Sequence, residues 1–274
     1  MPNISRILLT GGSGRLGDAI RKSGLFPNIF APSRSEFDIT NPATLSSFLL
    51  SKDVDAVIHC AAVSRIGIAE GNPSLAVLAN IAGTANLVQA ILGKERRSGK
   101  SIRFIYISTD NVYPGTRGNY QENDSTVPYN TYGWTKLGGE CAVRCLKNHC
   151  IIRTSFFAPE AIRFDDSPID MYSSKLPIMD LAGAIHSLVH LPFVGVVNVG
   201  DKRRSEYERY KVHKLGIKPT TFEDVQKQTP FPLAKDASLD TSLWKSLTEK
   251  GIANTHKKKQ AVEKLSNQQG QNRG

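Results

Sequence analysis

A tyrosine and a lysine four residues apart, within "NTYGWTKLGGE" (130–140), are the side chains of this sequence that first point to chemistry. In a helix, Tyr132 and Lys136 share one face. A free tyrosine has a pKa of about 10, too high for easy proton exchange at neutral pH. An ammonium about 4 Å away stabilises the phenolate by about 4 kcal/mol at an effective dielectric of about 20, against about 1 kcal/mol in water. We therefore expect an acid/base pair only where these residues are shielded from solvent and lie against a cofactor.

Thr109 is the third candidate for chemistry, at the end of the apolar run "SIRFIYISTD" (101–110). Its hydroxyl could donate a hydrogen bond to a substrate carbonyl. Tyr132 would then give a proton to that oxygen, while a reduced nicotinamide gives hydride to the carbon. Lys136 would also bind the nicotinamide ribose. The three residues together predict carbonyl reduction.

Gly11, Gly14 and Gly17 form a glycine pattern between an apolar run and a helical stretch. One such glycine permits a sharp turn, the next lets backbone approach a pyrophosphate, and the third lets helix and strand pack closely. The helix N-terminus then offers N–H groups to phosphates. The pattern predicts a dinucleotide site, and a glycine-rich turn without a ligand is the alternative.

The residues after the second predicted strand bear on the choice of dinucleotide. An NAD site usually has an acidic residue there, which binds the ribose 2′-hydroxyl. In "APSRSEFDIT" (31–40), Ser33 and Arg34 come first, whereas Glu36 and Asp38 come later. Arg34 could meet a 2′-phosphate, which favours NADPH over NADH. A surface arginine without a ligand is the other reading.

Alternating strands and helices must position these residues. Short apolar runs predict strands at 6–11, 28–33, 54–62, 101–110, 150–157 and 195–200. Amphipathic runs predict helices at 15–23, 45–53 and 74–94, from the Tyr-Lys segment onward, and at 180–191. This alternation is typical of an α/β doubly wound parallel sheet of the Rossmann type. We expect a single domain over 1–252, with a small substrate-binding cap formed by about 157–175 and 201–247.

Composition and charge bear on whether the protein is a membrane, secreted or nucleic-acid-binding protein. Hydrophobic residues make up 40% of the chain, and we find no apolar run near the roughly 20 residues that span a bilayer. The N-terminus lacks the pattern of a secretory signal, so we expect a cytoplasmic protein without a membrane partner. The net charge is +10. Part of it lies in a polar, basic segment over 253–274, which we expect to be disordered. A solvated tail is favoured over a nucleic-acid partner.

Cysteine and histidine spacing gives no metal prediction. The four cysteines form no CxxC pair and read as small buried side chains. His186 and His190 have metal-like spacing, but the sequence supplies no evident third ligand. We expect no metal site.

Seven stretches occur in the order of one known family: "GGSGRLG", "SEFDIT", "HCAA", "ISTDNVYPGT", "YNTYGWTKLGGE", "IIRTSFF" and "ASLDTS". Through them the chain resembles the extended short-chain dehydrogenases/reductases, and specifically the dTDP-4-dehydrorhamnose reductase group. The resemblance implies Thr109, Tyr132 and Lys136 as the catalytic residues. It places Gly14, Arg15 and Leu16 on the cofactor pyrophosphate, Asp38 and Ile39 near the adenine, Ala61, Ala62 and Val63 along the middle of the cofactor, and Thr109, Asp110, Asn111 and Phe156 on the substrate.

The activity that the resemblance implies is NAD(P)H-dependent reduction of the 4-keto group of a nucleotide-linked 4-keto-6-deoxy sugar. The alternatives are a sugar-nucleotide epimerase or epimerase-reductase, and a non-catalytic NADP-binding regulatory subunit resembling that of methionine adenosyltransferase. A homodimer is left open. The chain departs from the family at Asn111, where an aromatic residue is common, and at Phe156, where tryptophan is usual. Its cap is also shorter than in typical members.

Overall fold

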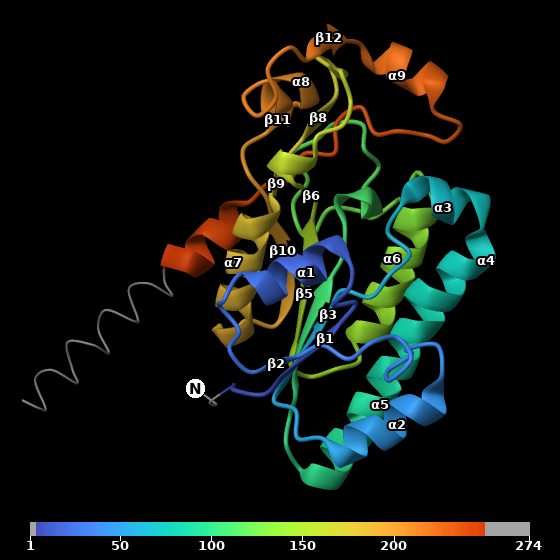
Figure 1. Ribbon diagram of the computed structural model, residues 1–274, viewed down its shortest axis with the longest axis vertical. Helices are drawn as coiled ribbons and strands as arrows, with labels where there is room; N and C mark the ends of the chain where they lie inside the picture. Colours follow the sequence, from blue (N-terminus) through green and yellow to red (C-terminus); the bar gives the residue numbers. More distant parts are fainter. Residues whose placement is uncertain (1–3, 250–274) are drawn as a thin grey trace, which may run out of the picture.

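A six-stranded parallel β-sheet runs through the centre of the molecule (Figure 1). The structure, a computed structural model, describes residues 4–249, so the tail expected over 253–274 lies outside it. Across the sheet the strand order is β10-β5-β4-β3-β1-β2. The strands are β1 (Ile7–Thr10), β2 (Ile29–Phe30), β3 (Ala56–His59), β4 (Arg103–Ile107), β5 (His149–Thr154) and β10 (Gly195–Val199). The predicted doubly wound parallel sheet is confirmed.

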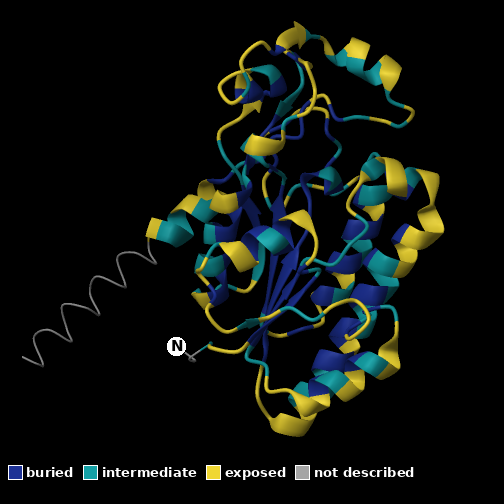
Figure 2. Ribbon diagram, viewed as in Figure 1, coloured by how far each residue is buried: buried dark blue, intermediate teal, exposed yellow. Residues whose placement is uncertain are grey.

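Helices cover both faces of the sheet, which buries its central strands (Figure 2). One face packs against α1 (Arg15–Lys22), α7 (Ile178–His190) and a helix over 242–249, and the other packs against α2 (Pro42–Ser51), α5 (Gly83–Ser98) and α6 (Thr131–Val143). Successive strand residues point to opposite faces. Phe104 belongs to the core on the α5 side, for example, and Ile105 to the core on the α7 side. Both faces therefore need apolar residues, and continuous apolar runs result.

The chain changes direction across the sheet between β1 and β3. From β1 it passes through α1 to β2 on one side, and later through α2 to β3 on the other. The loops at the carboxyl ends of β1 and β3 therefore diverge and leave a crevice, where sheets of this type bind ligands. Because Thr10 lies beside His59 in the strand register, the residues that follow them border this crevice.

Residues 157–175 and most of 201–247, the segments expected to form a cap, lie together beyond the carboxyl ends of the strands, at the top of Figure 1. Residues 242–247 belong instead to the helix over 242–249, which packs against the face of the sheet. Two short strand pairs connect the two cap segments: β8 (Tyr172–Ser173) with β11 (Arg204–Ser205), and β7 (Asp166–Pro168) with β12 (Lys218–Thr220). A third pair, β6 (Phe156–Phe157) with β9 (Leu176–Pro177), flanks the first segment. Two short helices, α8 (Glu206–Tyr210) and α9 (Phe222–Gln228), complete this part.

One long helical stretch corrects an expectation from the sequence. The short α3 (Ile66–Gly71) precedes α4 (Pro73–Ala76), a π-helical turn (Val77–Ala82) and α5, and the last three form continuous helix over Pro73–Ser98. It has 26 residues and contains an 18-residue window with a mean hydropathy of 1.7, which would suffice to cross a bilayer by length and composition. The search for long apolar runs missed it because Asn80, Thr84 and Asn86 interrupt the apolar residues. In the fold, its buried face packs on the sheet and against α2 and α6.

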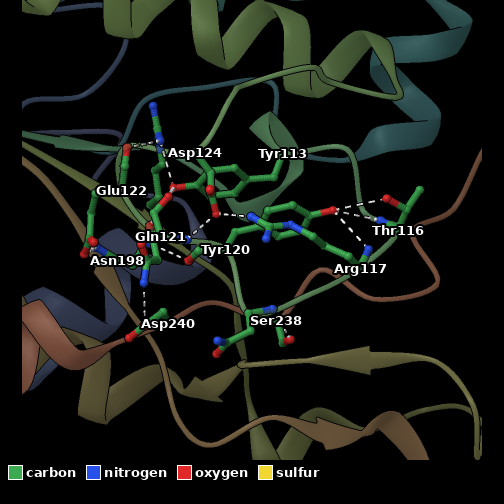
Figure 3. A network of polar contacts seen from close by, with 12 residues as sticks. Tyr113, Thr116, Arg117, Tyr120, Gln121, Glu122, Asp124, Asn198, Ser238 and Asp240 are labelled. Atoms are coloured by element: carbon green, nitrogen blue, oxygen red, sulfur yellow. Dashed lines mark hydrogen bonds and ion pairs between the residues drawn. The ribbon is translucent and has the colours of Figure 1, made fainter.

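A hydrogen-bond network fixes the segment after β4 (Figure 3). The Tyr113 hydroxyl lies 2.9 Å from the carbonyl oxygen of Gln121 and 3.1 Å from Oδ1 of Asn198 in β10. The Asn198 amide donates to the carbonyl of Tyr120 (2.8 Å), which also accepts from the backbone N–H of Asp240 (2.8 Å). The end of the cap is thereby tied to a loop much earlier in the chain.

Candidate active site

The glycine loop between β1 and α1 has the geometry of a phosphate cradle. Gly11 has φ +71°, and a Cβ there would lie 2.6 Å from the backbone nitrogen of Ala61. A Cβ on Gly17 would lie 2.2 Å from the carbonyl oxygen of Gly11. Gly14 is the N-cap of α1, and no side chain caps the helix start. The first-turn N–H groups therefore face the crevice and suit a pyrophosphate.

A cavity of about 560 Å³ lies at the carboxyl ends of the central strands, between the sheet and the cap. Every residue expected at a site lines it: Gly11, Gly14, Arg15, Leu16, Gly17, Arg34, Asp38, Ile39, Ala61, Ala62, Val63, Thr109, Asp110, Asn111, Tyr132, Lys136 and Phe156. His186 and His190 lie outside its lining. The structure thus brings cofactor, catalytic and substrate candidates into one space.

Buried hydrogen bonds hold the wall that follows β3. The Thr10 hydroxyl lies 2.6 Å from Nδ1 of His59 and accepts from the backbone N–H of Ala61 (3.2 Å). Nε2 of His59 lies 3.0 Å from the Thr84 hydroxyl. Burial, aided by the nearby Lys136 ammonium, lowers the pKa of His59 to about 3. A neutral imidazole therefore bridges two hydroxyls and sets the position of residues 60–62.

Asn80, in the π-helical turn, supports the same wall from the other side. Its side chain accepts from the backbone N–H of Val63 (2.8 Å) and donates to the Val63 carbonyl (3.1 Å). It also donates to the Thr135 hydroxyl in α6 (2.9 Å). The sequence analysis missed this residue, since an asparagine within an apolar helix gives no signal of its partners.

Arg34 and Asp38, from the loop after β2, both line the cavity. The Arg34 side chain is 75% exposed, and its Nε lies 3.2 Å from Oδ2 of Asp38. The Glu36 carboxylate accepts instead from the backbone N–H (2.8 Å) and hydroxyl (2.7 Å) of Ser33. Glu36 does not line the cavity, so Arg34 and Asp38 are the two charged residues that this loop contributes to the lining.

Polar side chains define the start of α6 and so the position of Tyr132. Asn130 is the N-cap and accepts from the backbone N–H of Gly133 (2.7 Å). Glu70, at the end of α3, accepts from the Thr131 backbone N–H (2.6 Å) and hydroxyl (2.9 Å). Two caps from different elements therefore fix the first turn of this helix.

The pKa values of Tyr132 and Lys136 differ from the sequence-based expectation. Burial lowers the pKa of Lys136 to about 7, and its ammonium lies 4.0 Å from the centre of the Tyr106 ring. Burial, followed by the charge of Asp110, raises the pKa of Tyr132, and a hydrogen bond with Thr109 opposes this rise. The expected lowering of the tyrosine pKa by the lysine is therefore wrong: the net shift is upward, and the groups that oppose it are Thr109 and Arg15. The phenol is protonated at neutral pH, as a proton donor must be.

Asn111 acts as a clamp on the residues expected to contact substrate. Its Nδ2 donates to Thr109 Oγ1 (3.1 Å) and Asp110 Oδ1 (2.7 Å), and its Oδ1 accepts from the Tyr129 hydroxyl (2.7 Å) and Asn130 Nδ2 (2.9 Å). The amide is therefore fully used within the protein. Although Asn111 lines the cavity, this geometry makes it a residue that positions Thr109 and Asp110.

Two cap residues in the cavity lining, Lys175 and Glu206, were not anticipated. Lys175 precedes β9, which pairs with β6 and so brings the lysine beside the strand that carries Phe156. Glu206 opens α8. They lie in the two stretches where the sequence pattern loosens, so periodicity gave no signal for their meeting.

The fold and the joint placement of a glycine loop with Thr109, Tyr132 and Lys136 define a dinucleotide-binding protein of the short-chain dehydrogenase/reductase class. The chain belongs to the family described as RmlD substrate binding domain, whose sequence model matches residues 5–160.

Individual relatives agree with this family. The dTDP-4-keto-6-deoxy-D-glucose reductase of Streptomyces niveus is 31% identical over 236 residues, covering 78% of this chain and 80% of that protein. Methionine adenosyltransferase 2 subunit beta of Xenopus laevis is 30% identical over 183 residues, covering 62% of this chain and 52% of that protein. The fold also matches a solved dTDP-4-dehydrorhamnose reductase of Bacillus anthracis in complex with NADP, with TM-score 0.77, 23% identity, and coverage of 92% of this chain and 99% of that one.

Proposed function

We propose that this protein is an NADPH-dependent reductase of the 4-keto group of a dTDP-linked 4-keto-6-deoxy sugar. The observation that carries the proposal is the single cavity in which the glycine loop, Thr109, Tyr132 and Lys136 meet. The reductase of Streptomyces niveus aligns over 80% of its length, whereas the methionine adenosyltransferase subunit aligns over 52%. This difference favours the reductase over a regulatory subunit.

Each of the residues in the cavity has its own role in the proposed reaction. Tyr132, which its surroundings keep protonated, gives its proton to the carbonyl oxygen. Thr109 orients that oxygen with its hydroxyl, and Lys136 stabilises the tyrosinate that results. Glycine loop N–H groups bind the pyrophosphate, and Arg34 binds the 2′-phosphate. NADPH, when bound, supplies the hydride.

Two further assignments belong to this proposal. Segments 157–175 and 201–247, apart from the sheet-packed residues 242–247, act as the substrate cap of one domain over 1–252, because Met171, Tyr172 and Leu233 line the same cavity. A cytoplasmic location follows from the need for a reduced dinucleotide.

A homodimer also belongs to the proposal. Exposed apolar side chains outside the cavity lining lie on α3, the π-helical turn and α6: Ile68, Val77 and Trp134. Covering part of this surface with a second copy would remove apolar area from water. Sedimentation equilibrium of the purified protein distinguishes a dimer from a monomer.

The activity is tested by following NADPH oxidation with dTDP-4-dehydrorhamnose and analysing the sugar formed. We expect turnover by the wild type and its loss in Tyr132→Phe, with NADPH affinity unchanged within about twofold, because only the proton donor is removed. A product with inverted configuration at a carbon other than C4 would favour an epimerase-reductase. No oxidation with this or related 4-keto sugars would refute the proposal.

A further inference from the structure

An ion pair stands at the cap end of the cavity, away from the glycine loop. Nζ of Lys175 lies 2.8 Å from Oε2 of Glu206. The lysine side chain is 25% exposed and lines the cavity, whereas the glutamate side chain is 4% exposed. None of the chemistry described above uses this pair.

The surroundings hold the pair in one geometry. The Ser173 hydroxyl donates to Oε1 of Glu206 (2.6 Å), and the Arg209 guanidinium donates to the carbonyl oxygens of Ser173 (2.6 Å) and Lys175. Segment 173–175 and helix α8 are thus bound together by side-chain and backbone contacts. Such preorganisation is typical of a binding group and lowers the entropic cost of contacting a ligand.

The lysine retains hydrogen-bonding capacity toward the cavity. An ammonium has three donors. One N–H donates to Glu206, and a second donates to the Tyr210 hydroxyl, which lies 3.4 Å from Nζ. Although burial lowers the pKa of Lys175, the charges of Glu206 and Tyr210 outweigh it and the net change is upward, so the ammonium stays charged. Asp110, beside the Thr109 hydroxyl, also interacts electrostatically with this ammonium. Lys175 therefore connects the cap with the residues around the reacting carbonyl.

We propose that Lys175 is a sugar-binding residue, whose remaining N–H donates to an oxygen of the substrate sugar while Glu206 holds the ammonium in place. This inference rests on the proposed function and narrows its substrate class. Glu206 pairs with the ammonium at 2.8 Å, and Asp110, which lines the same cavity, is a second carboxyl group that interacts with it electrostatically. A sugar that carries a carboxylate would meet both, so the subsite suits uncharged, hydroxyl-bearing sugars.

Binding of dTDP-L-rhamnose and of dTDP to the NADP⁺-saturated protein, measured by calorimetry, tests this assignment. The wild type should bind the rhamnose nucleotide more tightly than dTDP. In Lys175→Met, affinity for dTDP-L-rhamnose should fall by about 10- to 100-fold, the effect of one charge-assisted hydrogen bond, while affinity for dTDP changes by less than about twofold. Lys175→Arg keeps an ion pair with Glu206 but moves the third donor, so it should also lose sugar affinity.

Lys214 provides a matched control. Its ammonium forms a 2.8 Å ion pair with Asp165 in the same cap, but it does not line the cavity. Lys214→Met should therefore leave both affinities unchanged. An equal loss for both ligands in Lys175→Met, or full sugar affinity in either Lys175 variant, would show that the ion pair is only structural and overturn the assignment. A wild type that prefers dTDP would instead overturn the proposed function together with it.

Discussion

Burial moves the pKa values of Tyr132 and Lys136 in opposite directions, and both shifts bear on proton transfer. A protonated phenol next to an ammonium of lowered pKa is ready to donate a proton and then to be stabilised as tyrosinate. The Tyr106 ring faces the ammonium and supplies a cation–π contact. Because the pKa of Lys136 is lowered to about 7, the lysine is only partly protonated at neutral pH.

Lys136 predicts a measurable pH dependence of stability. Its pKa is about 7 in the folded protein against 10.5 ordinarily, so the unfolded chain binds the extra proton between these values. The free energy of unfolding of the cofactor-free protein should therefore rise with pH across this window, by at most about 1.4 kcal/mol per pH unit from this group. Denaturant titrations of the wild type and Lys136→Met measure the difference. Parallel pH profiles for the two proteins would contradict the prediction.

Arg34 predicts the cofactor preference. Arg34→Ala should raise the KM for NADPH by about tenfold, because the variant lacks the charge-assisted hydrogen bond from the exposed guanidinium to the 2′-phosphate. The KM for NADH, which has no 2′-phosphate, should stay within about twofold. Steady-state kinetics with both dinucleotides give the ratio. Lys22→Ala is the control, because Lys22 is an exposed cation of α1 outside the cavity lining. An equal change for both dinucleotides would rule out a contact with the 2′-phosphate.

Helix α6 must approach the loop after β4 closely for Tyr132 and Thr109 to meet. Gly133 allows this approach because it has no side chain: a Cβ there would lie 2.3 Å from the carbonyl oxygen of Asn111. The helix start is simultaneously held by Glu70 from α3 and by Asn130. The position of the phenol thus depends on three contacts from separate parts of the chain.

Gly133→Ala should displace the helix start. We expect a loss of about 1–3 kcal/mol in unfolding free energy from overpacking, and a fall in kcat larger than stability alone explains. Gly183→Ala is the matched control, since Gly183 lies within α7 with open space around its Cα, and alanine there should stabilise by about 0.5–1 kcal/mol. Thermal unfolding and turnover measurements on both variants test the predicted changes in stability and in kcat. Full activity in Gly133→Ala would show that the helix tolerates the shift.

These elements also show which features of the site could be predicted from the sequence. The Tyr132–Lys136 spacing and the glycine loop are local patterns, so their helix and their turn could be predicted directly. The Asn111 clamp and the Glu70 cap join residues whose distance depends on tertiary packing. The sign of the Tyr132 pKa shift was missed for the same reason, because burial is a property of the fold and not of spacing.

A buried ion pair connects the catalytic helix to the centre of the molecule. Glu140 of α6 accepts from Arg153 of β5 through both oxygens (3.0 and 2.7 Å) and from the Ser108 hydroxyl (2.6 Å). Arg153 also donates to the Tyr113 hydroxyl (2.8 Å) and to the Glu122 carbonyl (3.2 Å). One charged pair thereby joins α6, β4, β5 and the segment shown in Figure 3.

Removing one partner of this pair should destabilise the whole protein. Glu140→Gln should lower the unfolding free energy by about 3–5 kcal/mol, because Arg153 is left as an uncompensated buried charge. The double variant Glu140→Gln/Arg153→Met should lose less than the sum of the two single variants. Denaturant unfolding of the four proteins forms the cycle. Additive losses would mean that the two side chains do not interact energetically.

Across the whole chain, the alternation of apolar runs predicted the parallel sheet and its crevice, and both are present. The cap could be placed only as two loosened stretches, because its strands are two or three residues long and pair across the chain. Lys175 and Glu206 belong to those stretches, so their ion pair required the folded arrangement to be seen.

The bonds between Tyr120 and the segment around Asp240 have a consequence for biosynthesis. A ribosome delivers the glycine loop, the Tyr132 helix and the loop at Tyr120 long before residue 240 has been added. Until then the carbonyl of Tyr120 lacks its contact with Asp240, and the cap has only its first segment. The residues of the glycine loop and of α6 are therefore available for folding early, whereas the cap cannot be completed until the segment around Asp240 has been synthesised.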